Sequence, residues 1–573
     1  MLRLNIVKLY NNSQSVINNR FLTTTLNQHN SSSSSGIGTF SQLSSLSLFS
    51  NRYCTNSNNS SKSNETTIDN KVRVRYAPSP TGMMHLGGLR TALFNYLFAK
   101  KNNGTFILRI EDTDRARTVE GSAKNLEDCL TWAGIPYDEG PARPATHIDI
   151  PSYVQSERLA IYQQHADRLL EQGYAYRCVC TPEELENARN LKAKKGAIMP
   201  ERCSCASMQD KIRAEAKPGE FTIRMKVPSD KTTKFTDVVK GNVQFSNQQI
   251  DDQILMKSDG FPTYHLASVV DDHLMGITHI IRGEEWLNST PKHILLYEYF
   301  GWKTPVFAHL PLLLNSDKSK LSKRQGDVSV DSYINKGYLP EALVNFVALL
   351  GWSPSESNKE IFTLDELVDG FTLESINKSG SVVNIERLDW MNVNHIRLLL
   401  ANDDSYLVLA KQIKDSLVQR LAIDESSIDD GYLKRAIHCI KERIVKIDES
   451  YTLLAPFFVH PQMNSEQAMK MKEKIWKSDV SPAQANQLLQ NLSELDESQY
   501  QSDVIYQTLQ STARTLYPEL KTDKEITGKT NQLMSVLRYL ITANPTGGNL
   551  PLTIETLGKS KTLERINHSL NQI

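Results

Sequence analysis

The chain has 573 residues and carries equal numbers of basic and acidic side chains, 65 Lys plus Arg and 65 Asp plus Glu. This length exceeds that of one ordinary domain and predicts three or more compact units with buried cores. The charge balance excludes a protein that binds nucleic acid through net charge alone, so contact with RNA must come from local basic patches. Seven cysteines in a chain of this size exclude a small secreted disulfide scaffold.

The first 64 residues contain no acidic side chain, but they carry five scattered basic ones, Arg3, Lys8, Arg20, Arg52 and Lys62. A basic, Ser-rich and acid-poor composition is typical of a transit peptide. We therefore expect residues 1–68 to direct the protein to the mitochondrial matrix. The plastid is the alternative destination, and a merely disordered Ser/Asn-rich extension is the alternative interpretation. No apolar run approaches the roughly 20 residues that a membrane span needs, so we expect no membrane association.

From residue 72 the apolar pattern alternates between short strands and amphipathic helices. Val72, Val74 and Tyr76 alternate as a strand, and a Pro/Gly-rich turn follows at residues 77–82. The pattern then predicts a helix over 86–100, a strand over 105–110 and helices over 118–132 and 155–170. This order predicts a parallel sheet with helices on its faces.

The alternation is interrupted and later resumes. Residues 174–247 have no regular period, which predicts an inserted subdomain. Helix signals then return at 264–270 and 290–300, and strand signals at 279–282 and 307–314. Beyond about residue 315 we expect helices and no strands, because apolar residues recur at helical spacing in the segments 433–447, 487–495 and 534–542.

Two segments carry the residues that chemistry on phosphate needs. Residues 78–88 (PSPTGMMHLGG) place His85, Gly87 and Gly88 where a strand turns into a helix, and a helix N-terminus attracts phosphate. There His85 can donate to α-phosphate oxygens as negative charge builds up on them. Residues 320–324 (KLSKR) form a cationic loop that can hold a leaving pyrophosphate. Taken singly, the first segment also fits an ordinary turn and the second a solvated surface loop.

Together the two segments resemble the signature motifs of class I aminoacyl-tRNA synthetases, with residues 85–88 (HLGG) similar to the HIGH motif and residues 320–324 similar to the KMSKS motif. Gly88 occupies the position of the second His, a replacement common in the family that the flanks indicate. These flanks, RYAPSPTG (75–82), RIEDTDR (109–115), PTYHLASVVDDH (262–273) and IRGEEW (281–286), resemble glutamyl-tRNA synthetases of the bacterial and organellar type. The resemblance runs over residues 72–331 and is looser beyond them, where LGKSKTLERI (557–566) is similar to the family's ending.

The resemblance implies an α/β fold: a split Rossmann-like parallel-sheet catalytic domain with an inserted acceptor-binding subdomain, followed by an all-α anticodon-binding region. The expected divisions are a transit peptide or disordered extension at 1–68, the first half of the catalytic domain at 69–176, the acceptor-end-binding insertion at 177–250, the second catalytic half at 251–314, the KMSKS loop with a helical connector at 315–395 and the anticodon-binding domain at 396–573.

Glutamate has two carboxylates and one ammonium group, so its pocket needs two cations and one anion. Arg75, Arg282 and Glu111 supply that set, although the same residues also fit structural ion pairs. By resemblance, Arg75 with Tyr264 would hold the side-chain carboxylate, Arg282 the α-carboxylate, and Glu111 with Ser79 the ammonium group. The division between the two arginines stays open. The other implied glutamate contacts are Ala77, His265, Leu266, Ala267 and Ser268.

The resemblance also implies the catalytic residues His85, Lys320 and Lys323. The ATP contacts that it implies are Thr81, His85, Gly87, Glu285, Trp286, Lys320, Leu321, Ser322, Lys323 and Arg324. Mg²⁺ would accompany ATP, held largely by phosphate oxygens and water. The implied reaction activates L-glutamate to glutamyl-adenylate with tRNA already bound, then transfers it to the 3'-terminal ribose of tRNA(Glu). Whether tRNA(Gln) is also charged stays open, and we expect a monomer.

Four of the cysteines form two tight pairs inside the predicted insertion, Cys178 with Cys180 and Cys203 with Cys205. Four thiolates in two close pairs suit a tetrahedral structural Zn²⁺. Reduced free cysteines are the alternative.

Three other functions are alternatives. Glutaminyl-tRNA synthetases have active-site motifs that differ from APSPTG and a β-rich anticodon region, and a truncated relative that modifies a tRNA base lacks an anticodon domain. The alternative of a different class is a catalytically silent paralogue that binds RNA or serves in assembly. Against it, both signature segments keep their His and Lys residues.

Overall fold

The computed structural model describes residues 71–572 except 146–148, 182, 185, 188–189, 191–203, 218, 322–328, 355–357 and 477–481. The predicted targeting extension therefore lies outside the described residues, as do Cys203, Ser322, Lys323 and Arg324. Within the described part, no helix has the length and apolarity that crossing a membrane requires.

The first half of the predicted sheet forms as a parallel strand–helix–strand unit. Strands β1 (Arg73–Tyr76) and β2 (Thr105–Leu108) pair in parallel, and α2 (Leu86–Lys101) makes the crossover between them. Every residue of β1 is buried, as expected for a parallel strand covered on both faces. Helix α3 (Ser122–Trp132) begins later than predicted, because Arg115–Arg117 form a separate 3₁₀ turn and Gly121 turns the chain at φ 78°.

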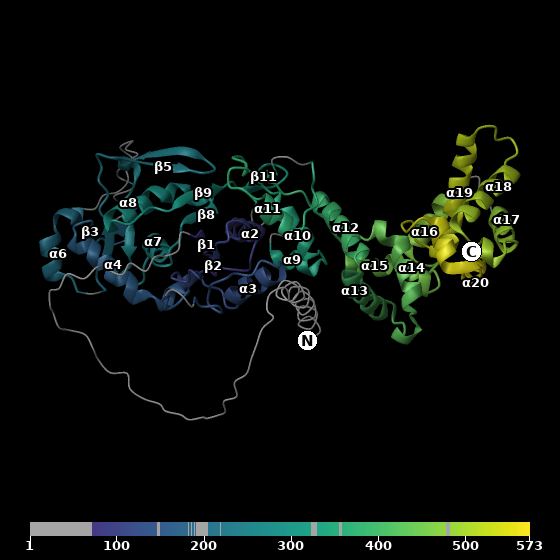
Figure 1. The fold of residues 1–573 in the computed structure, drawn as a ribbon, viewed down its shortest axis with the longest axis horizontal. Coiled ribbons are helices and arrows are strands. Elements are labelled where there is room, and N and C mark those ends of the chain that lie inside the picture. The colour runs from purple at the N-terminus through teal and green to yellow at the C-terminus, as the bar shows by residue number, and fades with distance from the viewer. Residues whose placement is uncertain are drawn as a thin grey trace, which may run out of the picture. The chain divides into compact units, whose positions relative to one another are not determined.

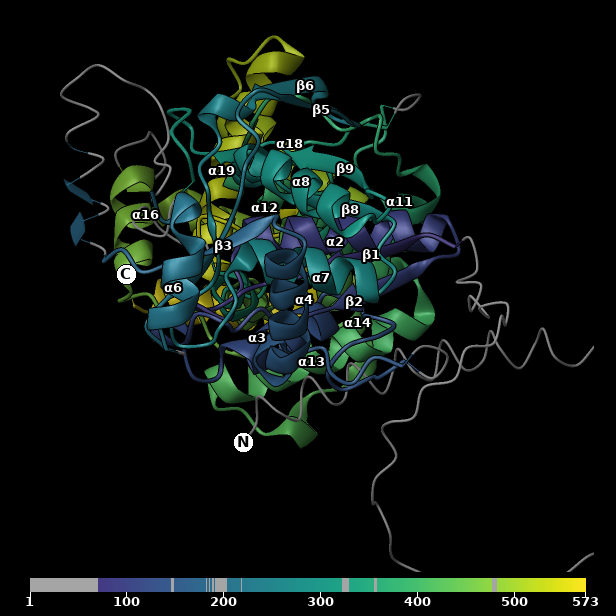
Figure 2. The same cartoon turned by 90° about the vertical axis from the view of Figure 1, so that its left-hand side faces the viewer.

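The second half of the sheet resumes after the insertion, as expected. Strands β8 (His279–Gly283) and β9 (Val306–Leu310) pair in parallel across the helix α8 (Thr290–Phe300), with Arg282 opposite His309. The β5 (Thr232–Asp237) and β6 (Gly241–Ser246) hairpin extends this sheet, so its order is β6-β5-β9-β8 (Figure 2). The N–H of Thr278, just before β8, donates to the carbonyl of Arg73 at 2.9 Å and joins β8 to β1.

A separate antiparallel sheet contains β3 (Ala175–Cys178), β4 (Thr222–Met225) and β7 (Ile254–Met256). The other helices of this region are α4 (Leu159–Glu171), α6 (Gln209–Glu215) and α7 (Tyr264–Leu274). Strand β5 belongs to the predicted insertion in sequence but pairs with β9, whereas β7 follows the insertion but pairs with β4. The predicted domain boundaries stay predictions.

The remaining described chain is almost entirely helical, as Figure 1 shows from α12 onward. One prediction here is wrong: β11 (Ser381–Val382) pairs in parallel with β10 (Leu313–Leu314), beyond the point where strands were expected to end. The helices are α9 (Val330–Asn335), α10 (Pro340–Ala348), α11 (Leu364–Gly370), α12 (Ile385–Ala401), α13 (Asp403–Leu421), α14 (Asp430–Ile440), α15 (Ser450–Phe458), α16 (Glu466–Trp476), α17 (Pro482–Ser493), α18 (Ser502–Leu516), α19 (Asp523–Thr542) and α20 (Leu550–Leu570).

Two predicted elements are shorter than their apolar patterns. The strand expected over 307–314 divides into β9 and β10 on either side of Pro311, which has no backbone N–H for a ladder. Helix α14 ends at Ile440, although Ile444 and Ile447 are buried in the same core as its apolar residues. The apolar spacing therefore extends past the end of α14 because Ile444 and Ile447 are buried, not because they belong to that helix.

The parallel strands place their following loops at one edge of the sheet. The carboxyl ends of parallel strands are the usual ligand site of such a fold, because the loops and helix N-termini converge there. Residues 77–85 follow β1, Glu111 follows β2 and Glu285 follows β8. This arrangement brings the sequence motifs into one region.

Gly104 tests the packing of the first strand pair. A Cβ at this position would lie 2.2 Å from the carbonyl oxygen of Val72, so Gly104→Ala must push β1 and β2 apart and should cost about 1–3 kcal/mol. Gly528→Ala is the matched control, because a Cβ there meets nothing within 4 Å in a helix interior and should stabilise by roughly 0.5–1 kcal/mol. Thermal unfolding should show a lower midpoint only for Gly104→Ala, and equal midpoints would contradict the packing.

Candidate functional site

A cavity of about 610 Å³ lies at the carboxyl ends of β1 and β8. It brings together thirteen of the residues predicted from the sequence, from both halves of the sheet and from the start of the cationic loop. They are Arg75, Ala77, Ser79, Thr81, His85, Gly87, Glu111, Tyr264, Arg282, Glu285, Trp286, Lys320 and Leu321.

His85 caps the helix that follows β1. Its Nδ1 accepts from the N–H of Gly88 at 3.0 Å, so the ring begins α2 and the proton of a neutral ring resides on Nε2. That N–H belongs to an exposed side chain on the cavity wall. His85 is therefore placed to donate to an anion at the N-terminus of α2.

Two glycines keep this helix start open. A Cβ on Gly88 would lie 2.7 Å from the hydroxyl oxygen of Tyr76, and a Cβ on Gly87 would lie 3.2 Å from the ring of His85. A larger residue at position 87 would therefore press on the ring that caps the helix, and one at position 88 would displace the hydroxyl of Tyr76. The prediction that small residues are needed here has a geometric cause.

The cationic segment enters the cavity beside the same helix start. The N–H of Leu321 donates to the carbonyl of Leu313 at 2.9 Å, which places Lys320 and Leu321 on the cavity wall. Nine residues later, the N–H of Val330 donates to the carbonyl of Met84 at 2.8 Å. Both ends of the segment that contains Lys323 thus lie close to His85.

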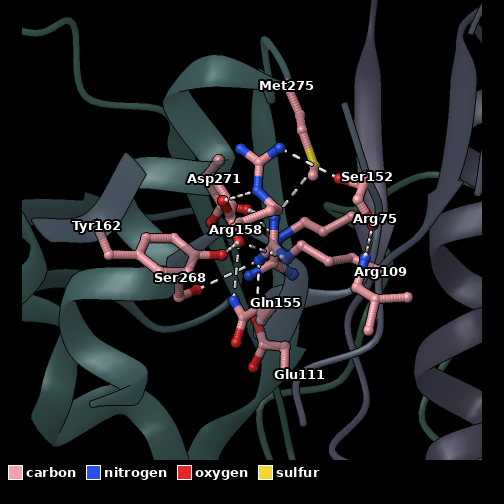
Figure 3. A network of polar contacts seen from close by, with 12 residues as sticks. Arg75, Arg109, Glu111, Ser152, Gln155, Arg158, Tyr162, Ser268, Asp271 and Met275 are labelled. Carbon is pink, nitrogen blue, oxygen red and sulfur yellow. Dashed lines mark hydrogen bonds and ion pairs between the residues drawn. The ribbon is translucent and has the colours of Figure 1, made fainter. Parts of the chain in front are cut away.

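Behind the cavity lies a buried network of arginines and carboxylates (Figure 3). Arg109, on the segment after β2, donates to Asp272 at 2.7 Å and to Glu111 at 2.9 Å. Arg158 donates to Asp271 at 2.8 Å, and Tyr162 and Gln155 also donate to this carboxylate. The network therefore joins β1 and β2 to the helix α7.

Arg75 and Glu111 are the two members of this network that reach the cavity. Within the described part of the chain, the side chain of Arg75 makes one hydrogen bond, from Nε to Asp272 at 3.0 Å. Its two terminal nitrogens therefore remain for a ligand in the cavity. Burial would raise the pKa of Asp272, but the charges of Arg109 and Arg75 hold that pKa below its ordinary value. Burial raises the pKa of Glu111 despite the opposing charge of Arg109.

Arg282 stands apart from the network, on β8. It is 4% exposed and donates to Tyr264, His293, His309, Thr290 and the carbonyl of Trp286 at 2.9–3.4 Å. None of these acceptors is a carboxylate. The ring centroids of Trp286 and Tyr264 are 4.1 Å apart, and both rings line this side of the cavity.

The structural ion-pair alternative is therefore half right. Arg75 and Glu111 do form buried ion pairs, with Asp272 and Arg109, and they line the cavity as well. Arg282 binds only uncharged groups among the described residues. A buried guanidinium surrounded by neutral acceptors suits an anionic ligand.

Four predicted glutamate contacts do not line the cavity. Leu266 and Ala267 are fully buried in the core around α4, α7 and α8, and Ser268 is 1% exposed beside Arg109 at 3.4 Å. His265 contacts His293 at 3.1 Å instead. Successive helical residues point about 100° apart, so Tyr264 alone among these five residues of α7 lines the cavity.

Several site residues had no role assigned from the sequence. Arg90 lines the cavity at 4% exposure and donates to the carbonyls of Leu350 and Pro311, and its burial lowers its pKa to about 10. Asp271 and Asp272 are the second set. Two adjacent acids on an otherwise apolar helix were the available signal, because such residues are rarely buried without a cation.

Three of the predicted zinc ligands converge. The sulfur atoms of Cys178, Cys180 and Cys205 all lie within 4.8 Å of one another, and Cys180 and Cys205 are 3.6 Å apart. Cys203 lies outside the described residues. Three thiols at this spacing fit three of the four corners of a tetrahedral thiolate site.

Two family descriptions match almost the whole described chain. Residues 71–390 match "tRNA synthetases class I (E and Q), catalytic domain", and residues 408–570 match "Anticodon binding domain". The catalytic match contains every residue that lines the cavity.

Individual proteins are similar over the same span. A glutamate–tRNA ligase of Chloroherpeton thalassium is 46% identical, covering 88% of this chain and 98% of that protein, and one of Clostridioides difficile is 40% identical, covering 88% and 99%. A crystal structure of a glutamate tRNA ligase from Elizabethkingia meningosepticum, in complex with its amino acid, is 36% identical, with a TM-score of 0.73 and coverage of 87% and 99%. The chain belongs to the glutamate–tRNA ligases of the class I aminoacyl-tRNA synthetase family.

Proposed function

We propose that this protein is a glutamate–tRNA ligase that activates L-glutamate with ATP and transfers it to the 3'-terminal ribose of tRNA(Glu). One observation carries the proposal: a single cavity holds Arg75, Arg282 and Glu111 beside the helix start that His85 caps. Two guanidinium groups and one carboxylate complement the charges of glutamate, and the helix start complements phosphate.

The assignment of the glutamate groups follows from which nitrogen atoms of the cavity arginines already make hydrogen bonds within the protein. The terminal nitrogens of Arg75 make no hydrogen bond within the described chain, so they can grip a carboxylate in the two-pronged manner of guanidinium groups. We assign the side-chain carboxylate to Arg75 with Tyr264, the α-carboxylate to Arg282 and the ammonium group to Glu111 with Ser79. A neutral amide in place of the side-chain carboxylate offers only one oxygen, so it cannot make the paired, charge-assisted hydrogen bonds that both terminal nitrogens of Arg75 can make with a carboxylate.

ATP is assigned to the N-terminal end of α2. His85 donates through Nε2 to the α-phosphate, and Lys320 and Lys323 neutralise the departing pyrophosphate. Glu285 and Trp286 line the cavity from the 3₁₀ helix that follows β8. Mg²⁺, held mainly by phosphate oxygens and water, would supply further positive charge.

The chemistry has two displacement steps. A carboxylate oxygen of glutamate attacks the α-phosphorus of ATP, the bond to the β-phosphate oxygen breaks, and pyrophosphate leaves. A terminal ribose hydroxyl of tRNA then attacks the carbonyl carbon of the glutamyl-adenylate, loses its proton, and AMP leaves. The side chains contribute positioning and charge stabilisation, so no covalent enzyme intermediate is required.

The all-helical end of the described chain supports this assignment against the related functions. Residues 408–570 match an anticodon-binding domain, and described residues 385–570 contain helices and turns but no strand. A relative without an anticodon domain would lack this part. We propose that the protein acts as a monomer.

We also propose a structural Zn²⁺ held by Cys178, Cys180, Cys205 and Cys203. The support is the convergence of three sulfur atoms, from the last residue of β3, from Cys180 two residues later and from the 3₁₀ turn Ser204–Ser207. A metal there would fix this end of the insertion, whose own core around these cysteines is small.

We place the protein in the mitochondrial matrix. The acid-free, Ser-rich and basic composition of residues 1–64 supports this location.

Variants of the two signature segments test the activity. His85→Ala and Lys323→Ala should each reduce glutamate- and tRNA-dependent pyrophosphate release by about 10²-fold or more, because each removes a donor from charge that develops during the reaction. Lys303→Ala, at an exposed surface lysine, is the matched control and should keep full activity. Circular dichroism should show an unchanged fold. Near-full activity in either signature variant would contradict the assigned site.

Metal analysis tests the cysteine site. Gently purified protein should contain about one zinc per chain, and Cys180→Ser should lose it, because fewer thiolates bind zinc more weakly. Cys439→Ser, at a buried cysteine outside the cluster, should keep its zinc. A content below about 0.3 zinc per chain in the unmodified protein would end the zinc proposal.

A reporter fusion tests the location. Residues 1–68 placed before a fluorescent protein should direct it to mitochondria in a eukaryotic cell, because basic, acid-poor extensions are import signals. The same extension with Arg3, Lys8 and Arg20 changed to Glu is the control and should leave the reporter in the cytosol. A reporter in plastids, or in the cytosol with the native extension, would contradict the proposal.

A further inference from the structure

The guanidinium of Arg282 has a cavity side and a buried side. Tyr264 and the carbonyl of Trp286 contact it from residues on the cavity wall, at 3.1 and 3.4 Å. Thr290, His293 and His309 contact it from behind and do not line the cavity, and each of the three is at most 1% exposed. An incoming carboxylate can replace the cavity-side contacts, so the buried contacts fix the orientation.

His309 provides the contact to Nε of Arg282. Its Nε2 lies 3.1 Å from that nitrogen, and its Nδ1 lies 2.6 Å from a carboxylate oxygen of Asp237. Because Nε–H of arginine is always a donor, Nε2 must accept, and the single ring proton must be on Nδ1. Burial lowers the pKa of His309 although Asp237 opposes this, so the ring is neutral at pH 7.

Asp237 is built to hold that proton in place. One of its oxygens accepts from the backbone N–H groups of Val239 at 3.0 Å and Lys240 at 2.8 Å, and the other faces His309. Burial opposes ionisation of Asp237, but the hydrogen bond from His309 and these N–H groups hold its pKa below the ordinary value. The carboxylate is therefore anionic and can only accept.

His293 is oriented by a similar chain without an acid. Its Nδ1 accepts from Nη1 of Arg282 at 3.1 Å, so its Nε2 must donate to Nδ1 of His265, also at 3.1 Å. Arg282 thus lies between two neutral imidazole rings. Among the described residues, Asp237 is the one carboxylate in these hydrogen bonds, and it acts through His309.

We propose that Asp237 and His309 are positioning residues for Arg282: Asp237 holds His309 in the tautomer that accepts from Nε, and this orients the guanidinium toward a carboxylate of glutamate. The assignment rests on the proposed function and extends it to residues that do not touch the substrate. It also gives β5 a role in amino-acid binding, because Asp237 is its last residue.

Asp237→Asn separates this role from mere packing. The asparagine oxygen can keep the two backbone N–H groups, which turns its NH₂ toward His309. Nδ1 must then accept, the ring proton moves to Nε2, and an N–H meets the N–H of Arg282 instead of a lone pair. The shape of the side chain is unchanged, but Nε of Arg282 loses its acceptor, while His293 and Thr290 still accept from Nη1 and Nη2.

The experiment measures aminoacylation of tRNA(Glu) with radiolabelled glutamate by the full chain. Asp237→Asn should raise the KM for glutamate about tenfold or more, while the KM for ATP stays within about twofold of the native value. Asp252→Asn is the matched control, because Asp252 is also a buried aspartate, 3% exposed. It accepts from the backbone N–H of Val227 and the hydroxyl of Tyr176, each at 3.0 Å, and makes no contact with Arg282 among the described hydrogen bonds. Asp252→Asn should leave both constants unchanged.

A second pair of variants keeps the test independent of the stability of Asp237→Asn. His309→Gln places an amide oxygen near the position of Nε2 and should retain a glutamate KM closer to native. His309→Asn keeps the donor to Asp237 but lacks the acceptor, and should raise that KM. An unchanged glutamate KM in Asp237→Asn or His309→Asn overturns the positioning roles of Asp237 and His309 but leaves the proposed function intact. The same holds if the glutamate KM rises as much in Asp252→Asn as in Asp237→Asn. Turnover that does not depend on glutamate overturns the proposed function as well.

Discussion

The contact between Arg109 and the adjacent acids of α7 holds the site together. Arg109 is fully buried and lies between Asp272, Glu111 and, at 3.9 Å, Asp271. Removing one partner from such a cluster leaves a buried charge uncompensated, which typically costs about 3–5 kcal/mol. Because the partners come from β2 and α7, which lie on opposite sides of the insertion, this cluster fixes the two halves of the sheet against each other.

The charges behind the cavity divide into a balanced set and an unbalanced one. Arg75, Arg109 and Arg158 are matched by the carboxylates of Glu111, Asp271 and Asp272, so this set needs no ligand to be neutral. Arg282 has only neutral contacts, and Asp237 reaches it through an imidazole ring. Arg75 and Glu111 therefore serve both the fold and the cavity, whereas Arg282 is the cavity arginine without a carboxylate partner among the described residues.

The sequence predicted the parts of the site that lie in the parallel strands or just after them, because strand, turn and helix signals are local. His85, Arg75, Glu111 and Arg282 all line the cavity as expected. The prediction failed for Leu266 and Ala267, since a motif copied as a continuous stretch ignores that helical residues face different directions. His309 and Asp237 were not found, because their contact depends on β5 pairing with β9, and no local period predicts a pairing between residues 70 positions apart.

The central claim is that two arginines and a glutamate form a cavity for an amino acid with two carboxylates. A comparison of two amino acids tests it most directly. In a tRNA(Glu)-dependent assay with the native protein, labelled glutamate and labelled glutamine are offered in separate reactions. The account predicts efficient charging with glutamate and little with glutamine, whose side-chain amide lacks the two anionic oxygens that pair with the terminal nitrogens of Arg75. Equal charging with both would contradict it.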